Sequence, residues 1–325
     1  MKAPLGLLVI LATAVIPTLS WAAQAGTRVY RVGMLESVPA ESNRPNLDAL
    51  RKSLAAMGIV EGDNLIIEYR SAGGNAERFP ELAAELSRSK VDLIISRGTP
   101  ATNAARTATS SIPVVMATMG DPRPIVASFA RPGGNITGVT TFTTELMGKR
   151  VEIMKELIPN LARIALFHNM SNPAAAVEWD QMKAAASALG LQAELFDIRS
   201  GQALARAFDT AKQQRVGAII VGADGLMQMH QKITVDLALT NKIATGYPYL
   251  EAVESGGLVA YTINYADLYA RMGTLAGRIL KGAKPAELPV EQPTKFQLAV
   301  NIRTAQRLGL AIPPAVRLRV DKLVD

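Results

Sequence analysis

Short apolar runs alternate with amphipathic stretches along most of the chain. Compact runs rich in Val, Ile and Leu are typical of buried strands, and they predict strands over 29–35, 64–70, 91–95 and 113–117. Between these runs, apolar residues recur every three or four positions. This spacing predicts helices over 46–57, 77–88 and 100–109.

The same alternation begins again in the second half of the chain. Helices are predicted over 145–158, 173–189, 201–214 and 226–239, with strands over 163–167, 192–197 and 216–221. Repeated β-α-β units form parallel sheets with helices on both faces. The two runs have similar lengths, so we predict an α/β fold of two doubly wound parallel-sheet lobes. The stretch 131–135 precedes the first change of lobe, and a second change is expected near 261–264.

The strand ends carry the candidate chemistry, because ligands of open parallel sheets bind outside the carboxyl ends of the strands. Three strand ends run into a capping residue followed by Pro, at Thr99-Pro100, Asp121-Pro122 and Asn172-Pro173. The amides beyond such caps can receive a carboxylate. A fourth strand end carries Asp224, which could pair with a ligand ammonium group. The alternative is that these are ordinary helix caps.

Tyrosine is concentrated in one part of the chain. Five of the seven tyrosines lie at 247, 249, 261, 265 and 269. A tyrosine combines an apolar ring with a hydrogen-bonding tip, which suits a binding cleft. Tyr247 and Tyr261 are candidates for the cleft wall. Tyr265 and Tyr269 are four positions apart on a predicted helix, and we expect them to pack inside the protein.

Composition removes several function classes. The chain has no cysteine, so it has no disulfide, thiolate metal site or cysteine nucleophile. Its two histidines form no metal motif, and no metal or other cofactor is expected. The net charge is +7, but the Lys and Arg residues are scattered, so no nucleic-acid partner is expected. The sequence contains no P-loop, no G-x-G-x-x-G and no G-x-S-x-G, and we predict no catalytic residues.

The first residues look like an export signal. Lys2 precedes an apolar run that extends to Leu19, and small residues follow at Ala23-Gln24-Ala25. This pattern is typical of a secretory signal peptide, with cleavage expected near Ala25. An uncleaved membrane anchor is the alternative, but the run is short for a span of about 20 residues. We therefore expect a signal peptide at 1–25 and a periplasmic protein.

Several motifs together resemble a known family. They include the segments 62–64 (Gly-Asp-Asn), 98–101 (Gly-Thr-Pro-Ala), 130–139 (Ala-Arg-Pro-Gly-Gly-Asn-Ile-Thr-Gly-Val) and 279–285 (Ile-Leu-Lys-Gly-Ala-Lys-Pro), followed by 288–296. Over residues 28–325 the chain resembles the periplasmic substrate-binding proteins of ABC uptake transporters, in the subgroup that includes aromatic-amino-acid binders.

The resemblance implies a type I periplasmic-binding-protein fold and a division into lobes joined by a hinge. The expected N-terminal lobe is 26–138 plus 264–287, and the C-terminal lobe is 139–263 plus 288–325. Helix 265–281 would return to the first lobe, and 296–300 would add a strand to the second. The implied ligand contacts lie at strand ends that face the cleft: Glu36, Ser37, Thr99, Pro100, Asp121, Thr141, Asn169, Asn172, Asp224, Tyr247, Tyr261 and Asn264.

The implied function is non-enzymatic. A small solute, with an amino acid or small carboxylate as the leading class, would bind in the interlobe cleft by hinge closure and be presented to membrane permease subunits. A monomer is expected. Two alternatives use the same cleft: an exported ligand-sensing module for a membrane receptor, and a hydrolase on the same fold. The run 35–38 (Leu-Glu-Ser-Val) and Thr262 depart from the family pattern, which leaves the ligand class open.

Overall fold

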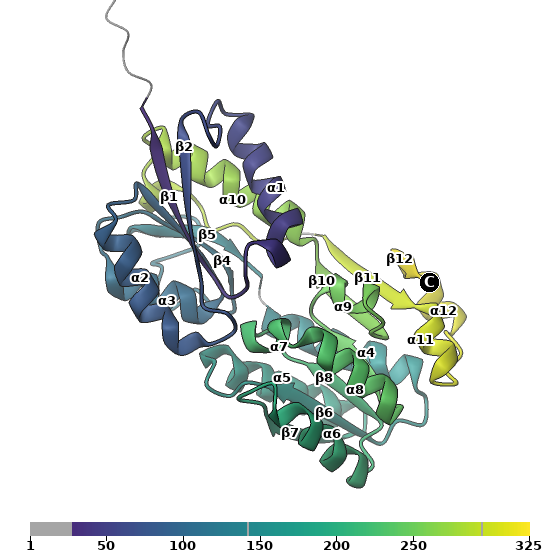
Figure 1. Ribbon diagram of the computed structural model, residues 1–325. Helices are drawn as coiled ribbons and strands as arrows, with labels where there is room; N and C mark the ends of the chain where they lie inside the picture. The colour runs from purple at the N-terminus through teal and green to yellow at the C-terminus, as the bar shows by residue number, and fades with distance from the viewer. Residues whose placement is uncertain (1–27, 142, 294) are drawn as a thin grey trace, which may run out of the picture.

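The computed structural model describes residues 28–141, 143–293 and 295–325, which form two α/β lobes, each built on its own sheet (Figure 1). The predicted fold class, two doubly wound lobes with parallel sheets, is therefore confirmed. The expected signal peptide at 1–25 lies outside the described residues.

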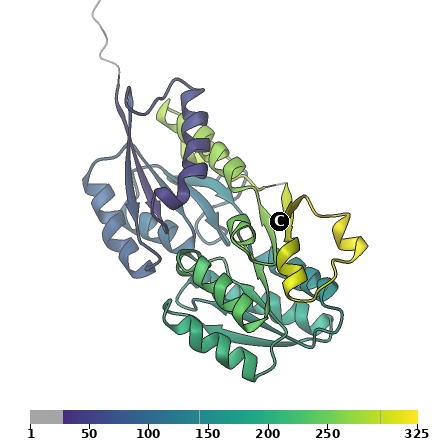
Figure 2. The same ribbon diagram turned by 45° about the vertical axis from the view of Figure 1, so that its right-hand side comes forward.

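The first lobe contains a five-stranded parallel sheet in the order β2-β1-β3-β4-β5. Its strands are β1 (Tyr30–Glu36), β2 (Leu65–Ser71), β3 (Leu93–Arg97), β4 (Val114–Met119) and β5 (Ile136–Thr140). Helices α1 (Arg44–Ala55) and α10 (Tyr265–Leu280) cover one face, and α2 (Phe79–Arg88) and α3 (Thr99–Ala108) cover the other (Figures 1 and 2). Along β1, Met34 packs toward α1 and α10, whereas Leu35 packs toward α2 and α3, as the two-residue period of a strand requires.

The second lobe contains a seven-stranded sheet in the order β12-β11-β10-β9-β8-β6-β7. Its strands are β6 (Arg163–His168), β7 (Gln192–Asp197), β8 (Ala218–Val221), β9 (Ala244–Tyr247), β10 (Val259–Ile263), β11 (Phe296–Asn301) and β12 (Lys322–Val324). Its helices are α4 (Thr143–Leu157), α5 (Pro173–Ala188), α6 (Ala203–Gln213), α7 (Gly225–Met229), α8 (Gln231–Asn241), α9 (Leu250–Glu254), α11 (Ile302–Arg307) and α12 (Pro314–Arg317). Strand β11 runs antiparallel to β10, so this edge of the sheet is mixed.

The two sheets repeat one strand order. Strands β7-β6-β8-β9-β10 correspond to β2-β1-β3-β4-β5, which is the doubly wound order 2-1-3-4-5. In such a sheet the chain turns to opposite sides at the carboxyl ends of the first and third strands, and this switch point leaves an opening for a ligand. The protein therefore has one switch point between β1 and β3 and a second between β6 and β8.

The chain passes between the lobes more than once. Helix α10 returns to the first lobe and packs closely on α1, and a Cβ on Gly273 would lie only 2.8 Å from the carbonyl oxygen of Leu50. Strand β11 then joins the second sheet, as the resemblance implied for both elements. The segments on either side of the crossovers near residues 138 and 287 stay paired with the first sheet. Strand β5 runs to Thr140, and Glu291 still pairs with it through Thr140 N–H to Glu291 O (3.0 Å) and Glu291 N–H to Gly138 O (2.8 Å).

Candidate functional site

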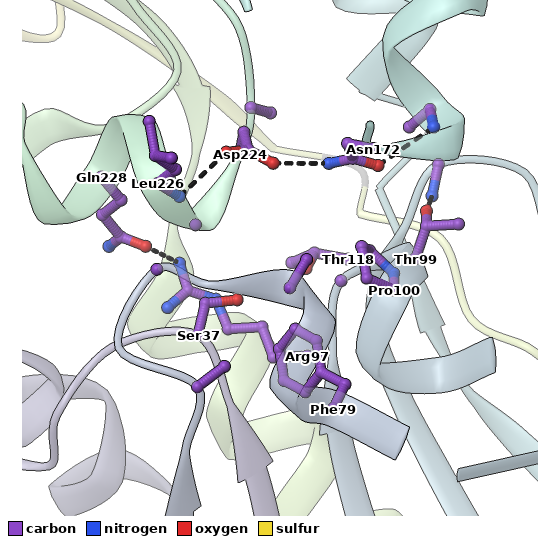
Figure 3. A pocket seen from close by; sticks show the side chains of 18 of the residues that line it. Ser37, Phe79, Arg97, Thr99, Pro100, Thr118, Asn172, Asp224, Leu226 and Gln228 are labelled. Carbon is purple, nitrogen blue, oxygen red and sulfur yellow. Dashed lines mark hydrogen bonds between the residues drawn. The ribbon is translucent and has the colours of Figure 1, made fainter. Parts of the chain in front are cut away.

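A pocket lies between the two lobes where the carboxyl ends of both sheets meet (Figure 3). Ser37 follows β1 and Thr99 follows β3, so both stand at the switch point of the first sheet. Asn172 follows β6 and Asp224 follows β8, so both stand at the switch point of the second sheet. The shared strand order thus brings two switch points face to face around one hollow.

The first lobe contributes Arg97, the last residue of β3, whose side chain is only 5% exposed. Its Nη1 atom lies 3.7 Å from Oε2 of Glu36, and its Nη2 atom donates to Oε1 of Gln228 at 3.0 Å. The guanidinium carbon lies 5.2 Å from the ring centre of Tyr265 and 5.9 Å from that of Tyr249, distances typical of cation–π contacts. Arg97 is therefore a buried cation held between a carboxylate and two aromatic rings.

Glu36 lies beneath the pocket rather than on its wall. Its side chain is fully buried, and its Oε1 atom accepts hydrogen bonds from the hydroxyl of Tyr269 (2.5 Å) and from Nδ2 of Asn43 (3.2 Å). Burial raises the pKa of the Glu36 carboxyl, although the neighbouring Arg97 charge acts in the opposite direction. Glu36 therefore contacts Arg97 from the interior of the first lobe and does not line the pocket.

The second lobe contributes a capped turn built around Asp224. Its Oδ1 atom accepts from the amide of Leu226 at 2.8 Å, which caps α7, and its Oδ2 atom accepts from Nδ2 of Asn172 at 2.9 Å. Asn172 in turn caps α5 by accepting from the amide of Ala174 at 3.0 Å. The two caps are thus linked, as Figure 3 shows, and they fix the Asp224 carboxylate at the wall of the pocket.

Two other residues in the first-lobe wall have unusual backbone conformations. Gly98 precedes α3 with φ of +86°, a conformation that favours glycine, and Thr99 accepts a hydrogen bond from the amide of Gly120 through Oγ1 at 3.2 Å. Thr118 has φ of +53°, at a shift of register between Ala117 and Met119 in β4. Strained residues and bulges of this kind occur often beside binding sites, where they redirect side chains.

The lobes touch at the rim of the pocket. The Arg97–Gln228 hydrogen bond crosses from β3 to α7. A Cβ on Gly225 would lie 2.6 Å from Cβ of Ser37, and one on Gly74 would lie 2.9 Å from Cγ of Met229. Both pairs join the first lobe to the second. The structure is therefore a closed arrangement in which the pocket is covered from both sides.

Five of the expected contact residues line the pocket, namely Ser37, Thr99, Pro100, Asn172 and Asp224. The others lie elsewhere. Glu36 lies behind the wall, as described above. Asp121 pairs with Arg123, Thr141 is buried beyond β5, and Asn169 lines a neighbouring groove. Tyr247 is in the core of the second lobe, Tyr261 stacks on Phe296, and Asn264 caps α10 through the amide of Asp267.

The sequence analysis missed several residues of the pocket wall: Phe79, Arg97, Thr118, Gln228, Tyr249 and Tyr265. Tyr249 and Tyr265 occupy the place that was assigned to Tyr247 and Tyr261. Arg97 was recognisable, because it is a charged residue at the end of β3, whose other residues (93–96) are uncharged. Among the described residues that line the pocket, Arg97 and Asp224 are the only charged side chains.

The described residues contain no group of three or more His, Cys, Asp or Glu side chains placed to hold a metal ion. No helix formed by these residues is long and apolar enough to cross a bilayer.

Comparison with known proteins gives consistent matches. The family described as "ABC transporter substrate binding protein" matches residues 31–324. A curated relative named "Tyrosine-binding protein", from Clostridioides difficile, is 26% identical over 272 residues, which is 82% of this chain and 78% of the relative.

Solved structures match over similar lengths. An ABC domain from Streptococcus pneumoniae in complex with L-Trp has a TM-score of 0.83 and 27% identity, covering 91% of this chain and all of that one. A ligand-free, open substrate-binding protein from Clostridium difficile has a TM-score of 0.63 and 24% identity, covering 91% of this chain and 99% of the other.

Proposed function

We propose that this chain, which belongs to the ABC transporter substrate-binding protein family, is the exported, periplasmic component of an ABC-type importer and captures an amino acid in its interlobe pocket. Members of this family bind small molecules and are not enzymes. Membership of the family does not specify the ligand class, the direction of transport or the compartment, for which we propose an amino acid, import and the periplasm.

The observation that carries the ligand class is the charge of the pocket wall. The first lobe supplies one cation, Arg97, and the second lobe supplies one anion, Asp224. An amino acid carries one charge of each sign, on the ammonium and carboxylate groups attached to its α-carbon. Its ammonium group would pair with Asp224, and its carboxylate would lie toward the first lobe, near the amino end of α3 and Arg97. Neither lobe alone offers both partners.

An aromatic side chain fits the remaining wall. Phe79, Tyr249 and Tyr265 line the same hollow, and aromatic rings favour one another in stacked or edge-to-face contacts. Relatives named for tyrosine and solved with L-Trp support the same class. We therefore take L-tyrosine and L-tryptophan as the first candidates, and L-leucine and small carboxylates as the next.

Capture would proceed by closure. An open form would expose Asp224 and Arg97 to water on separate lobes, and a ligand that pairs with both favours the closed form. The closed pair of lobes would then dock, as a monomer, on the membrane permease subunits. The signal-peptide pattern in residues 1–25 supports export to the periplasm.

Native mass spectrometry of gently purified protein, followed by thermal-shift titration, tests this function. We expect either a co-purified amino acid or a rise in melting temperature with L-tyrosine or L-tryptophan, because a ligand that binds only the folded protein stabilises it by mass action. No shift with any amino acid, together with a shift for a sugar or another uncharged solute, would contradict the proposed ligand class.

A further inference from the structure

Arg97 belongs to the first lobe, but much of its surroundings comes from the second. Gln228, on α7, accepts its hydrogen bond, and Tyr249, which follows β9, lies over its guanidinium. Figure 3 shows the side chain reaching across toward Gln228. Opening of the lobes would separate Arg97 from both of these residues and expose that side of its guanidinium to water, while the contacts with Glu36 and Tyr265 of the first lobe remain. Closure therefore removes the remaining water from a full positive charge.

The closed form does not satisfy this charge completely. The Nη1 atom of Arg97 is buried and has no hydrogen-bond partner, and the same is true of the facing Oε2 atom of Glu36. The two atoms are 3.7 Å apart, which is an ion pair but too long for a hydrogen bond. Burial also raises the pKa of Glu36, so the counter-ion is itself costly to keep charged. Burying an incompletely paired charge costs free energy, and this cost opposes closure.

A second anion beside the guanidinium would offset that cost. In the low-dielectric environment of a closed pocket, a carboxylate near Arg97 is attracted far more strongly than it would be in water. The wall of the pocket offers no such group on the first lobe, because its only described carboxylate is Asp224 of the second lobe. The missing anion would therefore have to come from the ligand.

We propose that Arg97 is the specificity-determining residue that makes lobe closure depend on a carboxylate in the ligand. This inference rests on the proposed function for the identity of the ligand, but it concerns one residue and one ligand group. Glu36 and Tyr269 act as positioning residues, because they hold Arg97 from below without lining the pocket.

Calorimetric titration with L-tyrosine and with tyramine, which lacks the carboxylate, tests whether Arg97 recognises the ligand carboxylate. We expect the wild-type protein to prefer L-tyrosine by about 100-fold or more, and Arg97→Met to reduce this preference by about tenfold or more. Arg97→Lys keeps the charge and should retain most of the preference. Arg106→Met, on the exposed side of α3, is the matched control and should leave it unchanged. Equal weakening of both ligands in Arg97→Met would mean a merely structural role and would overturn the proposal.

Small-angle scattering without ligand tests whether the burial of Arg97 opposes closure of the lobes. The double variant Glu36→Gln with Arg97→Met removes both buried charges, so it should fold without an unpaired carboxylate. We expect this variant to be more compact than the wild-type protein when no ligand is present, because closure no longer buries a charge. A ligand-free double variant as extended as the wild type would contradict the coupling to closure.

The two proposals can fail separately. If the wild-type protein binds no amino acid but binds 4-hydroxyphenylacetate, the proposed ligand class fails. The role of Arg97 is then upheld if Arg97→Met loses that binding, and overturned if the binding persists.

Discussion

The Nη2 atom of Arg97 lies 3.0 Å from Oε1 of Gln228, and this hydrogen bond joins the end of β3 in the first lobe to α7 in the second. It closes one side of the pocket without depending on a ligand atom. The bond therefore contributes to the closed form of every complex, whichever ligand is bound.

Replacement of Gln228 by Leu removes this acceptor and keeps most of the side-chain volume. A hydrogen bond to a charged group contributes about 1.5–3 kcal/mol, so we expect affinity to fall by about 10-fold or more. Because the bond involves no ligand atom, the affinities for L-tyrosine and tyramine should fall by the same factor in calorimetry. A change for L-tyrosine alone would contradict this interpretation of Gln228.

Asp224 should determine recognition of the ammonium group. The variant Asp224→Asn removes the negative charge, and we expect the affinity for L-tyrosine to fall by about 10- to 100-fold. Binding of 3-(4-hydroxyphenyl)propionate, which has no ammonium group, should change much less. The exposed residue Asp209 on α6 gives the matched control Asp209→Asn, which should have no effect. Equal losses for both ligands would show that Asp224 serves only as a helix cap.

Gly225 permits the close contact between the lobes, because a Cβ at this position would lie 2.6 Å from Cβ of Ser37. Gly225→Val should hold the lobes apart. The apparent dissociation constant scales inversely with the closed fraction, so we expect affinity to fall by about tenfold or more while the melting temperature changes little. Scattering should find a more extended molecule. Gly134→Val is the control, since a Cβ there would have nothing within 4 Å.

A buried ion pair supports the turn that carries Asp224. Nε2 of His168 lies 3.3 Å from Oε2 of Glu178, with both side chains fully buried. Burial alone would lower the pKa of His168, but the hydrogen bond and charge of Glu178, together with the charge of Asp224, more than offset this and raise it. Burial alone would raise the pKa of Glu178, but the hydrogen bond and charge of His168, together with the charge of Arg150, outweigh it and lower this pKa.

The pair therefore stabilises the fold over a limited pH range. The raised pKa of His168 contributes stability that is fully present below about 6.5 and is lost as pH rises through its folded pKa. The lowered pKa of Glu178 contributes stability that is lost as pH falls through its folded pKa. Urea unfolding from pH 6 to 9 should give a free energy that declines for the wild type and declines less for His168→Gln. Parallel curves for the two proteins would contradict this account.

The strand ends at the two switch points could be predicted from sequence. Apolar runs located β1, β3, β6 and β8, and the polar residues that follow β3, β6 and β8 include Thr99, Asn172 and Asp224, which line the pocket. Ser37, after β1, also lines the pocket, but only the family resemblance pointed to it. This worked because the carboxyl end of a parallel strand has a fixed relation to the cleft. Strand β5 was not predicted as a strand, because Thr137 and Gly138 interrupt its apolar pattern.

The contacts that bury Arg97 could not be predicted, because the residues that make them are distant in sequence. Glu36 meets the hydroxyl of Tyr269 across 233 positions, and no local pattern encodes that contact. Which tyrosines line the pocket could not be predicted for a related reason. Tyr247 ends β9 within the core of the second lobe, whereas Tyr249, two positions later, turns toward the first lobe. A shift of two residues at a strand end thus decides which ring reaches the pocket.

The most direct test of the central claim is the distance between the lobes with and without ligand. Because the chain has no cysteine, two introduced cysteines take spin labels specifically. Arg88→Cys, at the end of α2, and Gln181→Cys, on α5, place one exposed label on each lobe. On saturation with L-tyrosine, pulsed electron–electron double resonance should find the distance distribution shifted to shorter values and narrowed. An unchanged distribution at a concentration where calorimetry finds the site filled would contradict capture by closure.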